Sequence, residues 1–215
     1  MSFGSGSPGE SGLRIRRPSL YAVPGGKGSR MGAIAVHEFV SLDGVFEDPS
    51  WTFDFGFDPA MGEDIGRLTR ESDAILLGRR TFEMFAPAWS TRTAEDDPGA
   101  PFFNDSPKAV VSSTLDDETA ERTWRNSRSL GGYDVARIRE FADGFSGGVY
   151  ISGSGSLVRR LLGDGLIGSL HLFVYPVVRG TGARLFPEGS PPATLRLRQH
   201  DAYDNGVLHL HYTAA

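Results

Sequence analysis

The segment Ala74-Ile75-Leu76-Leu77-Gly78-Arg79-Arg80-Thr81-Phe82-Glu83 decides the fold of this chain. Its first four residues form a short apolar run, which is typical of a strand buried on both faces of a parallel sheet. A single glycine then leads into a helical pattern that continues to about Trp89. The free N–H groups at a helix N-terminus hold anions, and Arg79 and Arg80 add two positive charges beside them. The segment therefore predicts a strand-to-helix unit with a phosphate-binding turn.

The composition is that of a globular domain. The chain has 215 residues, of which 39% are hydrophobic, and its formal net charge of −5 disfavours a surface for nucleic acid. No apolar run approaches the ~20 residues of a spanning helix, and no signal peptide is readable, so we expect no membrane contact and a cytoplasmic location. The absence of cysteine excludes disulfides, thiolate catalysis and Cys-ligated zinc.

The chain divides into an N-terminal extension and one domain. Residues 1–30 are rich in glycine, serine and proline, and we expect them to be disordered. Residues 31–215 are expected to form a single domain, with folding starting at Met31.

Strand and helix patterns alternate through most of that domain. Strands are expected at residues 33–40, 74–77, 108–112, 148–151 and 170–178, with helices near 61–68, 81–89, 135–141 and 156–162 and a polar loop over 91–107. Strands at 194–200 and 207–212 then follow one another directly, and Asn205-Gly206 is a strong hairpin signal. The pattern predicts an α/β fold with a mainly parallel central sheet, flanked by helices, and antiparallel strands at the C-terminal end.

Ligands of such sheets bind at the carboxyl ends of the strands. Four expected strands end in polar or glycine-rich segments, at residues 41–51, 78–81, 112–114 and 152–156. Two of these are turns at helix starts, where small side chains let a pyrophosphate reach backbone N–H groups and serine hydroxyls add donors. Neither is a standard phosphate motif, because Val158 replaces the third glycine of the dinucleotide fingerprint and no Lys-Ser or Lys-Thr of a P-loop follows.

The order of these segments resembles that of the dihydrofolate reductase-like family. Its most similar branch is the RibD C-terminal domain, which is the riboflavin-pathway reductase, together with its stand-alone relatives. The resemblance covers residues 33–213 and rests on five segments: Ser41-Leu42-Asp43-Gly44, Leu77-Gly78-Arg79-Arg80-Thr81-Phe82-Glu83, Val110-Val111-Ser112-Ser113, Gly153-Ser154-Gly155-Ser156 and Tyr175-Pro176-Val177-Val178-Arg179-Gly180.

The resemblance implies an NADPH-dependent oxidoreductase. Each strand end then binds one part of the cofactor. The pyrophosphate and the 2′-phosphate side are implied to bind at Gly78, Arg79, Arg80 and Thr81, and the 2′-phosphoribose at Ser112 and Ser113. The pyrophosphate also contacts Gly153, Ser154, Gly155 and Ser156, and a mobile loop with Gly44, Val45 and Trp51 closes on the nicotinamide and substrate. The resemblance also implies a homodimer formed through an end strand.

The catalytic assignment is open between two roles for one carboxylate. Asp43 is the best-placed group for positioning or protonating the substrate, and it is equally a residue type that caps a turn beside Gly44. The aromatic residues from Trp51 to Phe57 fit either an apolar substrate slot or ordinary packing under a loop. His209 and His211 share a strand face as half a metal site or as packed side chains, and no metal is assigned.

The substrate expected is a small heterocycle, pyrimidine-like or pterin-like. Two positions depart from the riboflavin branch, because Ser152 stands where a glutamate is typical and Val45 stands where a lysine is frequent. These departures weaken the case for a phosphoribosylated pyrimidine. The alternatives are a non-catalytic nucleotide-binding or interaction member of the fold, and a reductase that uses flavin or deazaflavin.

Overall fold

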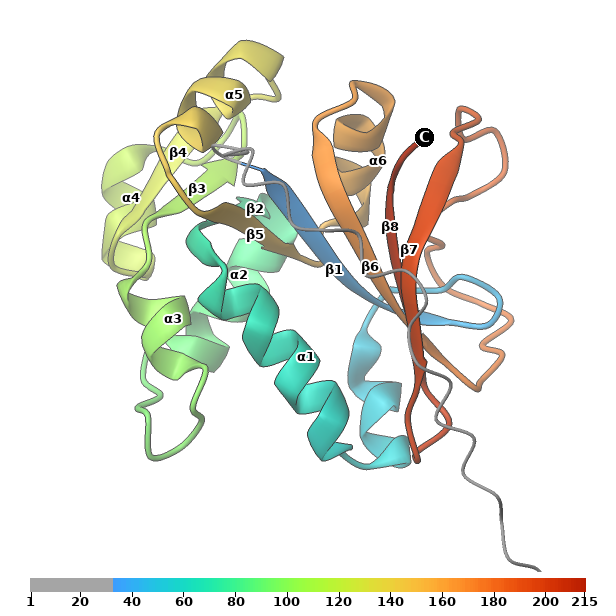
Figure 1. Ribbon diagram of the computed structural model, residues 1–215. Helices are drawn as coiled ribbons and strands as arrows, with labels where there is room; N and C mark the ends of the chain where they lie inside the picture. Colours follow the sequence, from blue (N-terminus) through green and yellow to red (C-terminus); the bar gives the residue numbers. More distant parts are fainter. Residues whose placement is uncertain (1–32) are drawn as a thin grey trace, which may run out of the picture.

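The computed structural model describes residues 33–215. The predictions for the 1–30 extension and for folding from Met31 lie outside the described residues. The elements, shown in Figure 1, are β1 (Ile34–Ser41), the 3-10 helix η1 (Pro49–Phe55), α1 (Pro59–Arg70), β2 (Ser72–Gly78), α2 (Arg79–Trp89), α3 (Ala100–Asp105), β3 (Lys108–Val111), α4 (Asp117–Thr123), β4 (Ser127–Gly131), α5 (Val135–Asp143), β5 (Gly148–Ser152), α6 (Gly155–Gly163), β6 (Ile167–Tyr175), β7 (Leu195–Ala202) and β8 (Leu208–Ala214).

The strands form one eight-stranded sheet in the order β4-β3-β2-β5-β1-β6-β8-β7. The first six strands in this order are parallel, whereas β8 runs antiparallel to β6 and to β7. The hairpin between β7 and β8 turns at Gly206, which has a positive φ of 84° that suits glycine. The predicted mainly parallel sheet with antiparallel C-terminal strands is therefore confirmed.

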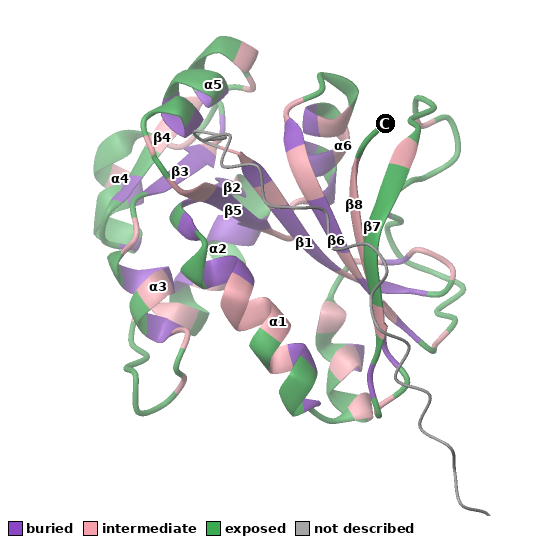
Figure 2. Cartoon of the chain, in the orientation of Figure 1, coloured by how far each residue is buried: buried purple, intermediate pink, exposed green. Residues whose placement is uncertain are grey.

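Helices cover both faces of the central part of the sheet, so neighbouring residues of β2 are buried on opposite faces. On one face, Ala74 and Leu76 of β2 pack in a cluster with residues of α5 and α6. On the other face, Ile75 and Leu77 pack with residues of α1, α2 and α3. This two-sided burial explains the continuous apolar run at 74–77, and Figure 2 shows the central strands as the most buried part of the chain.

Four short elements were not predicted, and the first of them is η1, which follows β1. The interval 91–107 is not wholly a loop, because it contains α3, and both α4 and β4 follow β3 before α5 begins. Short helices have weak periodicity and depend on tertiary contacts. One such contact is the buried Lys108, whose Nζ donates to the carbonyl oxygens of Phe103, Asn104 and Ser106 and so satisfies the end of α3. Within residues 33–215, no helix is long and apolar enough to cross a membrane.

Candidate cofactor site at the strand ends

Two predicted phosphate-binding turns meet in space through one serine. The Oγ of Ser154 accepts a hydrogen bond from the backbone N–H of Gly78 at 2.8 Å and donates to Oγ1 of Thr81 at 2.6 Å. The contact is possible because β2 and β5 are neighbours in the sheet, so α2 and α6 begin side by side. Residues 76 positions apart in the chain therefore form a single site.

Glycine is required on both sides of this contact. A Cβ added to Gly78 would lie 2.9 Å from Ser154 Oγ, which is closer than such atoms approach. On the opposite turn, Gly153 has a φ of +72° and Ser154 a φ of +69°. Two successive left-handed residues turn the chain sharply from β5 into α6, and only the second carries a side chain.

Within residues 33–215, no side chain caps the N-terminus of α2 or of α6. Gly78 has no side chain with which to cap α2, and Ser154 forms no capping hydrogen bond to α6 because its hydroxyl is directed to the other turn. The N–H groups of both first turns therefore face the same region with their partial positive charges. Ser156, in the first turn of α6, is exposed there.

The two arginines of the opening segment differ in their contacts. Arg79 is bound on both sides, by an ion pair to Glu83 at 2.7 Å and by a hydrogen bond to the hydroxyl of Thr114. Arg80 is exposed and forms no ion pair within residues 33–215. Arg79 thus joins the β2 end to the β3 end, and Arg80 keeps a free guanidinium at the start of α2.

The two serines after β3 also differ. Ser112 is buried, and its Oγ accepts hydrogen bonds from the backbone N–H groups of Thr114 and Leu115. Ser113 is exposed. The Ser112 side chain therefore shapes the turn, and the exposed Ser113 directly precedes Thr114, whose hydroxyl contacts Arg79. Their contact with a cofactor phosphate stays a prediction.

Asp43 lies just after β1 and binds the segment that follows β6. Its carboxylate accepts hydrogen bonds from the backbone N–H groups of Arg179 and Gly180, at 3.0 and 2.9 Å, and from the hydroxyl of Ser41 at 2.7 Å. The Ser41 hydrogen bond and then the backbone hydrogen bonds hold the pKa of Asp43 well below its usual range. A carboxylate in this state is a poor proton donor at neutral pH, so the geometry favours a positioning role.

The start of the predicted nicotinamide loop pairs with residues 184–185, so it is not open. Val45 is buried and forms an isolated antiparallel bridge with Arg184, and the Gly44 carbonyl accepts the N–H of Leu185 at 2.8 Å. Trp51 is buried in η1, where its ring packs edge-to-face on Tyr175 with centroids 5.4 Å apart. Val45 and Trp51 therefore contribute packing here, and a direct contact of these two with substrate stays a prediction.

The aromatic run from 51 to 57 separates into two groups. Trp51 is buried and Phe55 packs with it in a cluster on Tyr175. Phe53 and Phe57 are 84% and 73% exposed. Core packing therefore applies to Trp51 and Phe55, and an apolar substrate slot at Phe53 and Phe57 stays a prediction.

Phe46 is a residue of this site that was not singled out from the sequence. A Cβ added to Gly155 would overlap the Phe46 ring, so the ring lies directly on the first residue of α6. The only sequence signal was an aromatic residue inside the expected mobile loop. In this structure, Phe46 covers the glycine turn at the end of β5.

Two buried titratable residues in β1 were also not singled out. Burial raises the pKa of Glu38 to about 8, and its Oε1 has no hydrogen-bond partner in the described part of the chain. Burial also lowers the pKa of His37 to about 3, and its Nδ1 lies 2.7 Å from the hydroxyl of Tyr150. Charged or polar residues in an otherwise apolar strand were the available signal.

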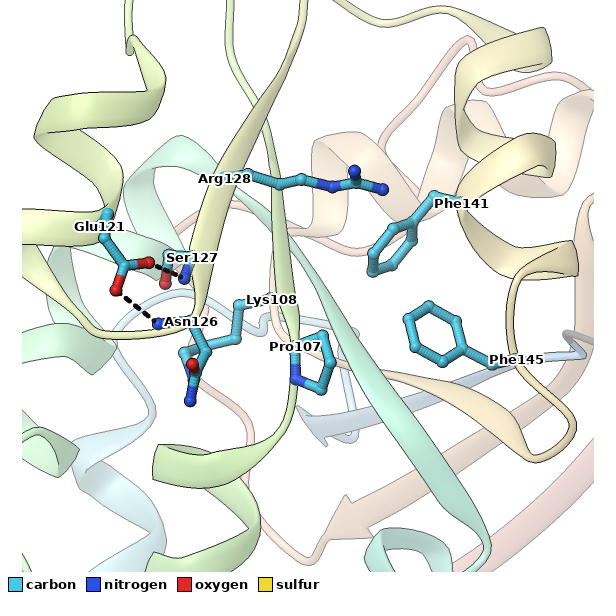
Figure 3. Close-up of a pocket in the computed structure, with 8 residues that line it drawn as sticks. All are labelled: Pro107, Lys108, Glu121, Asn126, Ser127, Arg128, Phe141 and Phe145. Carbon is cyan, nitrogen blue, oxygen red and sulfur yellow. Dashed lines mark hydrogen bonds between the residues drawn. The ribbon is translucent and has the colours of Figure 1, made fainter.

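A separate pocket of about 410 Å³ lies at the opposite ends of the strands. It is formed where β3 and β4 begin, and Figure 3 shows Glu121 accepting the backbone N–H groups of Asn126 and Ser127 there. These polar groups satisfy one another, and ligands of parallel sheets bind at the carboxyl ends. This pocket therefore lies away from the predicted cofactor site.

Comparison with known proteins agrees with this arrangement. The family model of the RibD C-terminal domain matches residues 33–132 and 134–209. The chain belongs to the RibD C-terminal domain family. The expected resemblance is confirmed, and the match spans all the strand ends described above. Among curated relatives, the uncharacterized protein YyaP of Bacillus subtilis (strain 168) is 23% identical over 177 residues, covering 80% of this chain and 90% of YyaP.

Solved structures with the same fold include a putative riboflavin biosynthesis protein, a pyrimidine reductase-like protein and a dihydrofolate reductase. A putative riboflavin biosynthesis protein from Shewanella sp. PV-4 has a TM-score of 0.64 at 20% identity, covering 85% of this chain and 99% of its own. A pyrimidine reductase-like protein from Corynebacterium diphtheriae has a TM-score of 0.59 at 14% identity, covering 85% and 92%. Dihydrofolate reductase from Enterococcus faecalis, complexed with NADP(H), has a TM-score of 0.52 at 16% identity, covering 86% and 97%. These likenesses establish the dihydrofolate reductase-like fold.

Proposed function

We propose that this RibD-family chain is an NADPH-dependent reductase of a small heterocyclic substrate, pyrimidine-like or pterin-like. The observation that carries the proposal is the pairing of two uncapped helix N-termini by Ser154, with Arg79 and Arg80 beside them. The family and the reductases among its structural neighbours support the reaction class.

The residues present fit a dinucleotide phosphate. Gly78 and Gly153 keep side chains away from the turns, so backbone N–H groups of Thr81 and Ser156 are available to pyrophosphate oxygens. The exposed guanidinium of Arg80 and the hydroxyl of Ser113 then take the additional phosphate on the adenosine ribose. Only NADPH carries that phosphate, so these groups favour NADPH over NADH.

Hydride transfer needs little from protein side chains beyond position. The bound nicotinamide supplies the hydride, and the protein holds donor and acceptor carbons in line and excludes water. In our proposal, Asp43 stays ionised and fixes the segment from Arg179 to Arg184 against the loop that begins at Gly44. Phe46 moves from Gly155 when the pyrophosphate binds, because its ring covers that turn.

The test is a titration of the full chain with NADPH and with NADH. Arg80→Ala should weaken NADPH binding about tenfold or more, the loss expected for one charge-assisted contact, and should change NADH binding much less. Arg122→Ala is the matched control, because Arg122 is an exposed arginine paired with Glu118 on α4, away from the strand ends. Equal affinities for NADPH in the two variants, or no NADPH binding below millimolar, would refute the proposal.

Turnover distinguishes the reductase from a non-catalytic binder. NADPH oxidation should be measured with panels of pyrimidines and pterins, and the same panels should be repeated with a reduced flavin and a reduced deazaflavin. NADPH that binds and is never oxidised would favour the binding protein, and turnover with only the other cofactors would replace NADPH as the hydride donor.

Dimerisation through an end strand remains part of the proposal. β7 is the edge strand at the C-terminal end of the sheet, and it carries Leu197 with 47% of its surface exposed. Light scattering of wild type and Leu197→Lys tests this edge. A dimer is expected for the wild type, and a dimer of unchanged affinity in the variant would exclude this edge as the interface.

A further inference from the structure

A buried imidazole faces two carboxylates on the α1 side of the sheet. His209 of β8 is 1% exposed, and its Nδ1 has no hydrogen-bond partner in the described part of the chain. This nitrogen lies 3.8 Å from Oδ2 of Asp64 and 3.7 Å from Oδ2 of Asp201. These three donor atoms all lie within 4.8 Å of one another.

Three separate elements bring these groups together. Asp64 lies in α1, Asp201 lies in β7, and the register of the C-terminal hairpin places Asp201 directly opposite His209. The carboxylates are held by other side chains. The Tyr203 hydroxyl donates to Asp64 Oδ2 at 2.6 Å, and the Gln199 amide donates to Asp201 Oδ2 at 2.7 Å. The oxygens are therefore oriented before any ion arrives.

The other nitrogen of His209 has a partner, which restricts the tautomer. His209 Nε2 lies 3.0 Å from Nδ1 of His171, and His171 Nε2 lies 3.2 Å from the hydroxyl of Ser169. If each Nε2–H donates along this chain, the lone pair of His209 Nδ1 points toward the two carboxylates. That arrangement is unfavourable without a cation, and it is the usual arrangement of a metal-binding histidine, whose second nitrogen donates to a neighbour.

The opposite tautomer does not satisfy the site. It directs Nδ1–H toward Asp64 and Asp201, but both oxygens lie beyond the roughly 2.7–3.2 Å of an N–H···O hydrogen bond. Burial also lowers the pKa of His209, against the influence of the two carboxylates, and so favours the neutral ring that binds metals. Arg67 pairs with Asp64 through Oδ1 at 2.5 Å, which leaves Oδ2 available.

We propose that His209, Asp64 and Asp201 bind a divalent transition-metal ion of the zinc class. One imidazole nitrogen and two carboxylate oxygens are a ligand set that zinc accepts, and their two negative charges are neutralised by the ion. Asp201 is 40% exposed, so water completes the coordination and provides the entry path. The ion fastens α1 to the β7–β8 hairpin. Of the two histidines noted in the sequence, His209 faces the carboxylates, and His211 stacks on His171.

The experiment is a titration of the full chain, after treatment with chelator, with ZnCl₂ in a calorimeter and in a thermal unfolding assay. One ion per chain is expected, with a rise in the unfolding temperature. Asp201→Asn replaces an exposed ligand at little risk to folding and should weaken zinc binding by about tenfold or more. His200→Gln is the matched control, because His200 is an exposed histidine on the same strand.

Two results would overturn the proposal. One is the absence of zinc binding tighter than millimolar in a chain that unfolds cooperatively. The other is equal weakening in the Asp201→Asn and His200→Gln variants, which would indicate adventitious surface binding. A second readout is the pair of ring-nitrogen NMR shifts of His209, in which Nδ1 should move on zinc addition.

Discussion

Glu38→Gln should remove a pH-dependent loss of stability. Glu38 lies in β1 between Val36 and Val40, whose side chains belong to the core cluster on the α5 and α6 face. Burial raises the pKa of Glu38 to about 8 from an ordinary value of 4.5, and the charge of Arg159 opposes this only in part. Below pH 4.5 the carboxyl is protonated in the folded and the unfolded chain, so it has no effect on their difference.

The sign and size of the effect follow from linkage. As the pH rises from 4.5 to 8, the unfolded chain loses the Glu38 proton while the folded chain keeps it, so stability present at low pH is lost. Each pH unit between the two pKa values costs about 1.4 kcal/mol, and the slope levels off near each pKa, so the loss between pH 5 and pH 8 is about 3–4 kcal/mol. Glutamine has the same shape without a charge, and the variant lacks this loss.

The assay is urea unfolding of wild type and Glu38→Gln at pH 5, 6, 7 and 8. The variant should gain stability over the wild type as the pH rises, because the contributions of histidines cancel between the two proteins. Glu140→Gln, an exposed glutamate on α5, is the control and should follow the wild type. If the difference between Glu38→Gln and wild type stays constant over this range, the assigned raised pKa is wrong.

Three further perturbations test other parts of the structure. The contribution of buried His37 to stability should fall between pH 7 and pH 5, because burial lowers its pKa to about 3, so that stability present above pH 6.5 is lost on acidification. The loss is about 2 kcal/mol at pH 5, and urea unfolding should show the wild type losing that much stability relative to His37→Gln. Asp43→Asn should speed tryptic cleavage after Arg179, since the carboxylate no longer holds the backbone N–H groups of Arg179 and Gly180. An unchanged cleavage rate would contradict the role of these two hydrogen bonds. Lys108→Met should lower the free energy of unfolding by about 1–3 kcal/mol, because it leaves the carbonyl oxygens at the end of α3 without their donor. The measurement is the denaturant midpoint, and a midpoint equal to that of the wild type would show that water replaces the ammonium group.

Local patterns were sufficient for the main elements of the fold. The apolar run at 74–77 predicted β2 because a strand buried on both faces is apolar at every position. Asn205-Gly206 predicted the hairpin, whose turn places Gly206 in the left-handed region. Short elements such as α3 were missed, because their stability comes from contacts such as those of Lys108 rather than from periodicity.

By itself, the sequence determined the order of the longer strands and helices and the polar segments at the strand ends, since these depend on residues close together in the chain. The tertiary structure decided which of these residues act together. It placed Ser154 between Gly78 and Thr81, gave Asp43 its partners 136 and 137 residues away, and buried Glu38 without a hydrogen-bond partner for its Oε1. Hydrogen bonding, burial and pKa depend on distances in space, and those are set only when the strands pair and the helices pack.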